Sequence, residues 1–281
     1  MAADGPLTLL TGASGFVGRH ILRELARRQR RVRLIARDGS INKISSFPVI
    51  ESMVTTADLF SESVGWHADV CRDVDIVIHA AWYAEPGQYL QSPKNRECLD
   101  GTLRLADGAA KAHVRRFVGI GTCFEYDLSA GLLSVETPLK PSTLYAQAKV
   151  AVFKTLSEKL PEQNIEFAWC RLFYLYGDGE DSRRLVPYLR GRLSAGEPAE
   201  LSSGTQIRDY MDIAEVARLV VNAALGPVQG PANICSGKGV TVRQLAETIA
   251  DEYGRRDLLR FGVRPDNLTD PPCVVGVPTA N

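Results

Sequence analysis

Tyr145 and Lys149 are the side chains of this 281-residue sequence whose types and spacing point most directly to proton transfer. They lie four residues apart in YAQAK, within a segment of helical periodicity, so they share one face of the predicted helix. A tyrosine phenol ordinarily has a pKa of about 10, and a nearby ammonium favours the phenolate and lowers that pKa. The pair therefore indicates a tyrosine acid–base group, tuned by the lysine, that acts on an alcohol or a carbonyl.

A second motif, TGASGFVG at residues 11–18, has the composition of a phosphate-binding turn. It follows an apolar run and opens a helical pattern, so the helix N-terminus offers free N–H groups to a pyrophosphate. Gly12 permits the tight turn, Gly15 lets the backbone approach the phosphates, and Gly18 lets the helix pack close to the sheet. The cofactor contacts expected here are Gly12, Ser14, Gly15, Phe16, Val17 and Gly18.

The end of the second predicted strand, residues 32–37, indicates which cofactor is used. Sites for NAD place an acidic residue there, where it accepts from the ribose 2′-hydroxyl. Counting from the glycine-rich turn, that place holds Ala36, and Arg37 follows it. A guanidinium can grip a 2′-phosphate with two hydrogen bonds and stack on adenine, so the sequence predicts NADPH. Asp38 beside Arg37 weakens this preference and leaves NAD as the alternative.

Short apolar runs alternate with longer helical patterns and must position these motifs. The predicted strands are 7–12, 32–37, 75–81, 116–122 and 167–172. The predicted helices are 15–30, 96–112, 142–160, 212–225 and 241–254, the last with Thr241 as its N-cap. This order predicts an α/β fold, a Rossmann-type doubly wound parallel sheet covered on both faces.

Composition restricts the partners and the compartment. The formal net charge is zero and 23% of residues are charged, which argues against nucleic acid or an anionic membrane as the main partner. Six cysteines form no CxxC pair and match no zinc pattern, so we expect buried thiols, no metal and a reduced cytoplasmic protein. No leader peptide or membrane span is expected. The basic stretch RRQRRVR (27–33) is typical of a solvated helix end.

The GxxGxxG spacing and the YxxxK motif together resemble the extended short-chain dehydrogenase/reductase family, which includes nucleotide-sugar epimerases, dehydratases and ketoreductases. The resemblance covers nearly the whole chain, through TTADL (55–59), HAAW (79–82), RLFYLYG (171–177), GTQIRDY (204–210) and NICSG (233–237). It implies an adenine contact from Asp58 and a nicotinamide-ribose contact from Lys149. The cofactor contacts that it adds are Asp58, Leu59, Ala80, Ala81, Tyr145 and Lys149.

The resemblance also implies a third catalytic residue in GIGTCFEYD (119–127). The family's hydroxyl lies four residues before a tyrosine that ends the strand motif, which makes it Thr122 if that tyrosine is Tyr126. Thr122 would hydrogen-bond the substrate carbonyl or alcohol and hold it against Tyr145. Dehydratases of the family carry an Asp-Glu pair directly after the hydroxyl. Cys123 and Phe124 hold those places here, and on a strand Glu125 would face the other way, so elimination of water is disfavoured.

The substrate contacts implied by the resemblance come from several segments. They are Trp82, Cys123, Phe124, Tyr174 and Arg208. Arg208 matches the arginine that grips the diphosphate of a nucleotide sugar, with an Arg208–Asp209 surface pair as the structural alternative. Tyr174 stands where sugar-nucleotide members have Asn, and Cys98 where a helix motif has Asn.

These observations predict an NADPH-dependent reductase of a 4-keto-6-deoxy nucleotide sugar. The alternatives are a nucleotide-sugar 4-epimerase with tightly bound NAD and an NADP(H)-sensing module without turnover. We expect residues 1–172 to form the cofactor domain, joined by 205–232, and residues 173–281 to form a smaller, discontinuous substrate domain. By analogy with the family, helices 96–112 and 142–160 are expected to form a homodimer interface.

Overall fold

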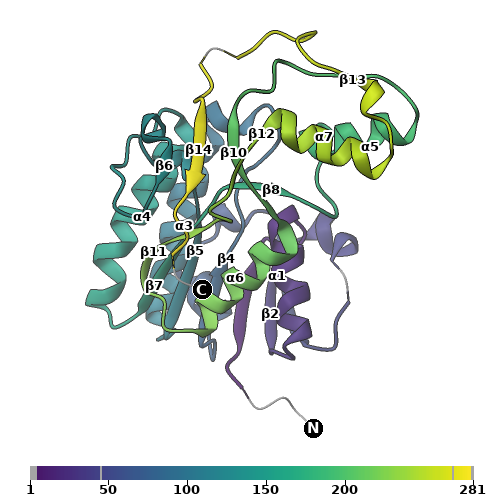
Figure 1. Ribbon diagram of the computed structural model, residues 1–281. Coiled ribbons are helices and arrows are strands. Elements are labelled where there is room, and N and C mark those ends of the chain that lie inside the picture. Colours follow the sequence, from purple (N-terminus) through teal and green to yellow (C-terminus); the bar gives the residue numbers. More distant parts are fainter. Residues whose placement is uncertain (1–4, 45, 268, 280–281) are drawn as a thin grey trace.

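The computed structural model describes residues 5–44, 46–267 and 269–279, and its centre is a seven-stranded sheet (Figure 1). The strand order is β3-β2-β1-β4-β5-β7-β11, and every pairing is parallel. The strands are β1 (Thr8–Thr11), β2 (Val32–Arg37), β3 (Ile50–Thr56), β4 (Ile76–His79), β5 (Arg116–Thr122), β7 (Glu166–Leu172) and β11 (Gly230–Ile234). The predicted α/β fold is thereby confirmed. The strand order reverses between β1 and β4, where ligands of such sheets bind.

Helices cover both faces of this sheet because neighbouring residues of a strand point in opposite directions. Leu10 and Val118 pack toward α1 and α6, whereas Leu9 and Phe117 pack toward α2, α3 and α4. The helices are α1 (Phe16–Arg27), α2 (Val64–Val70), α3 (Lys94–Lys111), α4 (Leu144–Glu162) and α6 (Ile213–Leu225). Each strand is thus buried on both sides, which explains why its sequence is almost continuously apolar.

A smaller lobe stands at the carboxyl ends of the strands (Figure 1). Its main sheet has the order β12-β10-β14-β6, and β8 also pairs with β10. Its elements are β6 (Leu132–Leu133), β8 (Tyr174–Tyr176), α5 (Leu185–Ser194), β9 (Ala199–Glu200), β10 (Ile207–Asp212), β12 (Gly239–Thr241), α7 (Val242–Glu252), β13 (Leu259–Arg260) and β14 (Cys273–Gly276). Thr241 caps α7, as its sequence predicts, in a reciprocal capping box with Gln244.

Several boundaries differ from the sequence-based expectation. Of the large sheet and the helices that cover it, β3, β11 and α2 were not predicted as elements, and residues 80–81 continue from β4 as a loop instead of a strand. Within the segment 205–232, α6 packs against α1 and β11 joins the large sheet, but β10 belongs to the small one. β6 also pairs in the small sheet although it precedes residue 172. The two units are therefore interleaved along the chain.

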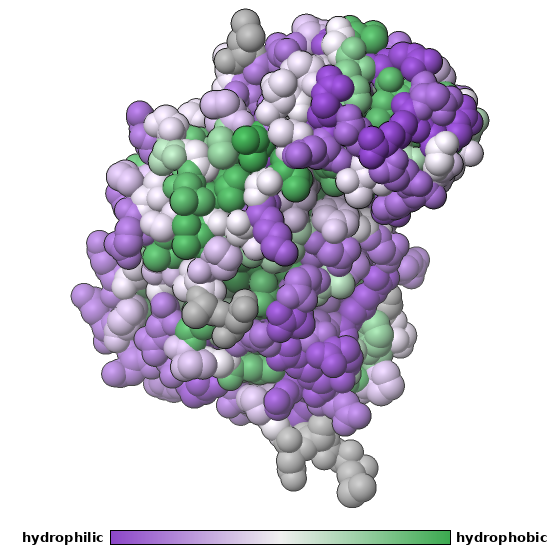
Figure 2. All heavy atoms as spheres, viewed as in Figure 1, coloured by the Kyte–Doolittle hydropathy of each residue, from purple (hydrophilic) through white to green (hydrophobic). Residues whose placement is uncertain are grey.

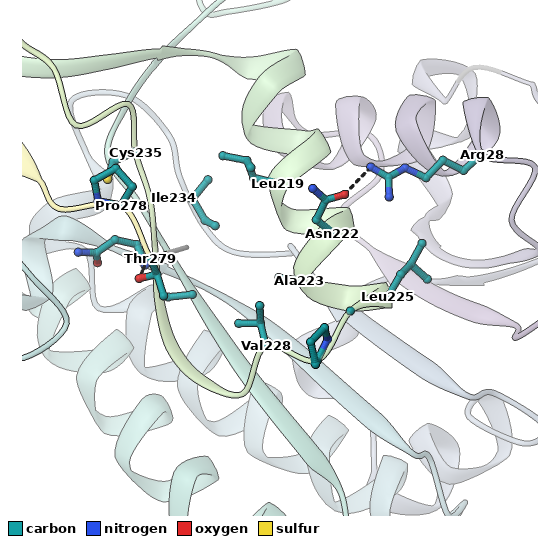
Figure 3. A pocket seen from close by; sticks show the side chains of 14 residues that line it. Arg28, Leu219, Asn222, Ala223, Leu225, Val228, Ile234, Cys235, Pro278 and Thr279 are labelled. Carbon is teal, nitrogen blue, oxygen red and sulfur yellow. Dashed lines mark hydrogen bonds between the residues drawn. The ribbon is translucent and has the colours of Figure 1, made fainter. Parts of the chain in front are cut away.

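The surface in Figure 2 mixes polar and apolar residues, and apolar residues gather over the region of β6 and β14. Within the described ranges, no helix is long and apolar enough to span a bilayer. A cavity of about 350 Å³ lies between the end of α6, β11 and residues 278–279, and Arg28 bonds Asn222 at its edge (Figure 3). None of the predicted catalytic or cofactor residues lines this cavity.

Candidate active site

The glycine-rich turn forms a cradle at the start of α1, at the switch point of the sheet. Gly12 has φ 75°, and a Cβ there would lie 2.7 Å from the Ala81 nitrogen. A Cβ on Gly18 would lie 2.1 Å from the Gly12 oxygen, so the protein's own packing requires both glycines. A Cβ on Gly15 would meet only the Gly12 oxygen, at 3.3 Å, so packing leaves space beside Gly15.

The start of α1 is suited to a pyrophosphate. No side chain caps the helix at Gly15, and its first turn holds no acidic residue. Free N–H groups and the positive end of the helix dipole therefore face the space beside Gly15. These residues fit the phosphates of a dinucleotide, as the sequence predicts.

The adenosine end of such a cofactor would meet β2 and β3. Ala36 is buried, while Arg37 is exposed at the last position of β2 and has no bonded partner among the described residues. Asp58 is half-buried and accepts from the Phe60 N–H, and Leu59 is buried beside it. The structure therefore brings Arg37, Asp58 and the glycine-rich turn to one edge of the sheet, at the ends of neighbouring strands.

His79 at the end of β4 fixes the loop that carries Ala80 and Ala81. Its Nδ1 lies 2.9 Å from the Thr11 hydroxyl, and its Nε2 lies 2.9 Å from the Thr102 hydroxyl. Thr102 donates to the Cys98 carbonyl and Thr11 accepts from the Ala81 N–H, so Nε2 carries the proton and Nδ1 accepts one. Burial lowers the pKa of His79 to about 3. It is therefore a satisfied core histidine and no base.

Lys149 and Tyr145 project from the first turns of α4 toward the end of β5. The Lys149 ammonium donates to the Ile120 carbonyl at 2.7 Å and lies 3.6 Å from the centre of the Trp82 ring. Trp82 also meets the Tyr145 ring edge to face, and its indole N–H donates to Asn95. The predicted substrate contact Trp82 thus lies against both Tyr145 and Lys149.

One electrostatic expectation is wrong. Burial raises the pKa of Tyr145, electrostatic interactions with Tyr89 and Glu125 raise it further, and a hydrogen bond with Thr122 opposes them. Burial also lowers the pKa of Lys149 to about 7. The lysine is itself desolvated, so its ammonium does not overcome the desolvation of the phenol. Tyr145 therefore keeps its proton at neutral pH, which suits a proton donor.

Thr122 is the last residue of β5 and the N-cap of a 3₁₀ turn, Cys123–Glu125. Its hydroxyl accepts from the Phe124 N–H and is near enough to Tyr145 to favour the phenolate. The structure thus brings Thr122, Tyr145 and Lys149 together, as predicted. The expectation for Glu125 is wrong, because strand alternation ends at Thr122 and the turn carries the Glu125 side chain back under it.

The other predicted substrate contacts lie together beyond this turn. Cys123 is buried, and Phe124 and Tyr174 meet edge to face with ring centres 6.2 Å apart. The Arg208 guanidinium lies 5.3 Å from the centre of the Tyr174 ring and pairs with Asp270 at 2.6 Å. Tyr174 thus packs beside the Arg208 guanidinium, at the place where related enzymes were expected to carry an amide.

The surface pair Arg208–Asp209 does not exist. Both residues are buried, and Asp209 accepts from the backbone of Ser236, Gly237 and Gly276 and from the Ser236 hydroxyl. Neighbouring side chains of a strand point to opposite faces of the sheet. Asp209 therefore binds the loop after β11 by hydrogen bonds, while Arg208 points to the other face, toward the site.

Two residues of the site escaped the sequence analysis. Tyr89 meets Tyr145 edge to face, with ring centres 4.9 Å apart, and the Arg184 guanidinium lies 5.8 Å from the centre of the Tyr89 ring. Arg183 beside it bonds Glu85 at 2.8 Å. The loop before α3 and the loop before α5 therefore meet over Tyr145. No motif marks Tyr89, because a contact between two loops leaves no periodic signal.

The cysteines offer no nucleophile. All six are free, five are buried, and Cys273 is partly exposed. Burial raises the pKa of Cys123 to about 12 and that of Cys98 to about 11, so both stay thiols at neutral pH. Among the described residues, no group of His, Cys, Asp or Glu could hold a metal ion.

Comparison with known proteins identifies the family. Residues 8–235 match the model of the NAD dependent epimerase/dehydratase family. The chain belongs to this family. It is 24% identical over 272 residues to dTDP-6-deoxy-L-talose 4-dehydrogenase (NAD(+)) of Aggregatibacter actinomycetemcomitans, covering 95% of this chain and 98% of that protein.

Two further comparisons agree with this assignment. The dTDP-4-dehydro-6-deoxy-D-allose reductase of a Streptomyces species is 25% identical over 303 residues, covering 99% of this chain and 89% of that protein. The fold superposes on UDP-N-acetylglucosamine 4-epimerase from Methanobrevibacter ruminantium M1 with a TM-score of 0.85 at 19% identity, covering 99% of this chain and 91% of the other. Family members thus include both dehydrogenases or reductases and epimerases, and a nicotinamide cofactor is common to the family.

Proposed function

We propose that the protein is an NADPH-dependent reductase of a 4-keto-6-deoxy nucleotide sugar. The observation that carries this proposal is the meeting of Thr122, Tyr145 and Lys149 at the end of β5, next to the glycine cradle. The turn that follows Thr122 supplies no free acid and base, because Cys123 stays a thiol and Glu125 is held in an ion pair with Arg171. Carbonyl reduction needs one proton donor, whereas elimination of water needs a further acid and base.

Each residue has a defined part in such a reduction. The nicotinamide, when bound, supplies the hydride for the sugar carbonyl carbon. Thr122 would hold the carbonyl oxygen by its hydroxyl, and Tyr145 would donate its Oη proton to the developing alkoxide. Lys149 would hold the nicotinamide ribose, and its positive charge would stabilise the phenolate left behind.

The aromatic and basic residues beyond the turn support a nucleotide sugar as substrate. Arg208 would bind the diphosphate, where a guanidinium matches the phosphate geometry. Phe124 and Tyr174 would pack against the apolar side of the sugar or base. The two relatives aligned above act, by their names, on dTDP-linked 6-deoxy sugars, which supports the substrate class.

Replacement of the catalytic tyrosine tests the reaction. Tyr145→Phe should bind NADPH as the unaltered protein does and should lower turnover at least about 100-fold, because the proton donor is lost while the ring packing remains. NADPH oxidation is measured with dTDP-, GDP-, CDP- and UDP-linked 4-keto-6-deoxy sugars, and the product sugar is identified. Near-normal turnover by the variant would refute the assignment.

The choice of NADPH is a separate proposal that rests on Arg37. Its exposed guanidinium, without a partner among the described residues, is available to a 2′-phosphate. Against it, the name of the Aggregatibacter relative specifies NAD. Arg37→Ala should raise KM for NADPH about 10-fold or more and leave KM for NADH nearly unchanged. An equal change in KM for NADPH and for NADH would refute the role of Arg37 in selecting NADPH.

A 4-epimerase is the second candidate, because the fold closely matches a solved UDP-N-acetylglucosamine 4-epimerase. An epimerase reoxidises its cofactor in each cycle and so retains it. The cofactor content of the protein purified without added cofactor distinguishes a reductase from an epimerase. Stoichiometric bound NAD, together with no net oxidation of NADPH, would establish the epimerase.

Three further features stay proposals. We infer a homodimer through α3 and α4, which pack against each other, and light scattering of the purified protein would test it. We assign residues 1–172 to the cofactor and residues 173–281 mainly to the substrate, which cofactor binding by variants of the small lobe would test. Six free thiols support a reducing, cytoplasmic location, and fractionation of cells would test that location.

A further inference from the structure

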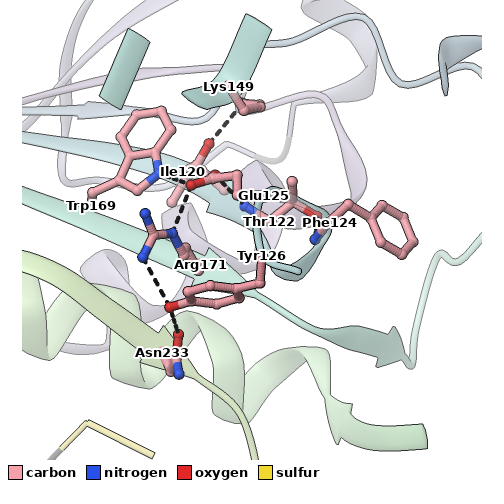
Figure 4. Close-up of polar contacts among 9 residues, drawn as sticks. All are labelled: Ile120, Thr122, Phe124, Glu125, Tyr126, Lys149, Trp169, Arg171 and Asn233. Atoms are coloured by element: carbon pink, nitrogen blue, oxygen red, sulfur yellow. Dashed lines mark hydrogen bonds and ion pairs between the residues drawn. The ribbon is translucent and has the colours of Figure 1, made fainter. Parts of the chain in front are cut away.

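Glu125 lies fully buried beneath the catalytic turn, where the sequence suggested no role for it. Its carboxylate accepts from the Arg171 Nε at 2.6 Å and from the Trp169 indole N–H at 3.0 Å (Figure 4). Arg171 in turn donates to the Tyr126 hydroxyl, and Tyr126 donates to Asn233 on β11. Burying an ion pair costs free energy. The presence of one here, held by several hydrogen bonds, therefore indicates that Glu125 has a function.

The carboxylate also holds the catalytic threonine. Glu125 accepts from the Thr122 N–H at 2.9 Å, while the Thr122 hydroxyl accepts from Phe124, which closes a capping box. A Cβ on Gly121 would lie 2.5 Å from the Glu125 carboxylate and 2.3 Å from the Trp169 indole nitrogen. Only glycine at position 121 leaves room for this arrangement, which explains the pattern GIGT.

The charge of the same carboxylate also acts on Lys149. Lys149 donates to the Ile120 carbonyl in β5, the strand that leads into the turn that Glu125 caps. Its ammonium lies 5.8 Å from the centre of the Trp169 ring, whose indole N–H donates to Glu125 (Figure 4). Lys149 is buried, and the Glu125 charge opposes the desolvation that lowers its pKa.

The other titratable groups around Lys149 and Glu125 supply no second anion at neutral pH. Those packed around the pair are Cys98 on α3, His79 on β4, Tyr145 on α4, Cys123 and Tyr126 beside the turn, and Arg171 on β7. The two cysteines, the two tyrosines and the histidine stay neutral, because burial raises the pKa of each thiol and phenol and lowers that of the histidine. Arg171 is a cation. Among the described residues packed here, Glu125 alone offers Lys149 an opposite charge.

We propose that Glu125 is a positioning residue of the catalytic group, which orients Thr122 through its backbone N–H and supplies the negative charge that favours the ammonium form of Lys149. The proposal rests on the proposed function for its catalytic consequence, but its electrostatic part holds for the protein without substrate. Without the Glu125 charge, burial of Lys149 would no longer be opposed by a carboxylate, and the lysine would lose its proton at a lower pH.

Glu125→Gln tests the charge. NMR of the lysine side chains, with the Lys149 signal assigned through Lys149→Arg, follows the titration of Lys149 directly and needs no substrate. We expect its midpoint to fall by about 1 pH unit or more in the Gln variant. The basic limb of the pH profile of kcat/KM should move to lower pH by the same amount, because turnover needs the ammonium.

Glu166→Gln is the matched control. Glu166 pairs with the buried Arg116 at the opposite end of the same two strands, β5 and β7. Its replacement also removes a carboxylate partner of a buried arginine without touching the site, although the Glu166 side chain is 37% exposed. Thermal unfolding should show both Gln variants folded and destabilised, and only Glu125→Gln should shift the titration of Lys149.

Glu125→Asp separates the two parts of the role and serves if the Gln variant does not fold. It keeps the charge and shortens the reach to Thr122, so we expect an unshifted Lys149 titration with a lower kcat. An unshifted titration in Glu125→Gln, or a shift in Glu125→Asp as large as the one expected for Gln, would overturn the proposal. A shifted titration with an unshifted profile of kcat/KM would support the electrostatic part and refute the role of Lys149 in turnover.

Discussion

His67 on α2 allows a quantitative prediction about stability and pH. Its side chain is fully buried against α3, and neither ring nitrogen has a hydrogen-bond partner in the described part of the chain. A Cβ on Gly108 would lie 2.4 Å from the His67 Cβ, so the two helices are in close contact here. Burial lowers the pKa of His67 to about 4, with the Arg104 charge adding to the effect and the Glu62 charge opposing it.

The sign and the size of the effect follow from linkage. The unfolded chain has a histidine pKa of about 6.5, so between pH 6.5 and pH 4 it binds more protons at this position than the folded protein does. The free energy of unfolding therefore falls as the pH falls through this range and is unaffected by His67 above it. A difference of about 2.5 pH units at about 1.36 kcal/mol per unit gives a loss of about 3 kcal/mol.

His67→Leu isolates this contribution, because it removes the titrating group and keeps an apolar side chain of similar size. Urea unfolding of both proteins is measured from about pH 4 to pH 8, and the difference in unfolding free energy is followed against pH. A constant packing offset cancels, so that difference should change by about 3 kcal/mol in favour of the leucine variant as the pH falls.

The effect of His67 must be separated from the effects of the other histidines. The pKa of His79 is also lowered, to about 3, first by burial, then by Lys149 and only third by His67, so most of its contribution is common to both proteins and cancels. His113→Asn serves as the control, because His113 is exposed at φ 57°, a conformation that Asn tolerates. If the curves of the unaltered protein and His67→Leu run parallel across the range, His67 is not held neutral by burial and the reasoning fails.

Three substitutions elsewhere have expected outcomes that follow from local geometry. Gly121→Ala should lower the unfolding free energy by about 1–3 kcal/mol in urea, because the new Cβ collides with Glu125, and an unchanged value would contradict the packing. Gly191→Ala, on α5 where a Cβ meets nothing within 4 Å, should instead raise it by about 0.5–1 kcal/mol in the same assay. Asp270→Asn should tighten binding of a nucleoside diphosphate about 10-fold by calorimetry, because it frees the Arg208 guanidinium, and weaker binding would place the diphosphate elsewhere.

The sequence by itself determined the parts of this protein that depend on short stretches of chain. The turn at Gly12–Gly18 and the Tyr145–Lys149 spacing are local, so backbone geometry and helical periodicity suffice to read them. Continuous apolar runs predicted five strands of the parallel sheet, because strands buried on both faces carry such runs. β3 escaped because half-buried and exposed residues interrupt it at the sheet edge.

Only the tertiary structure decided which distant groups meet and what their burial does to charge. Tyr89 reaches Tyr145 through loop packing, and Arg208 finds Asp270 some sixty residues away. The direction of the Tyr145 pKa shift depends on desolvation, which no spacing reveals, so the pKa of Tyr145 is raised where the spacing predicted that Lys149 would lower it. Glu125 acquired its place because the strand ends at Thr122 and the turn folds it beneath the site, where a carboxylate can both cap the turn and face the lysine.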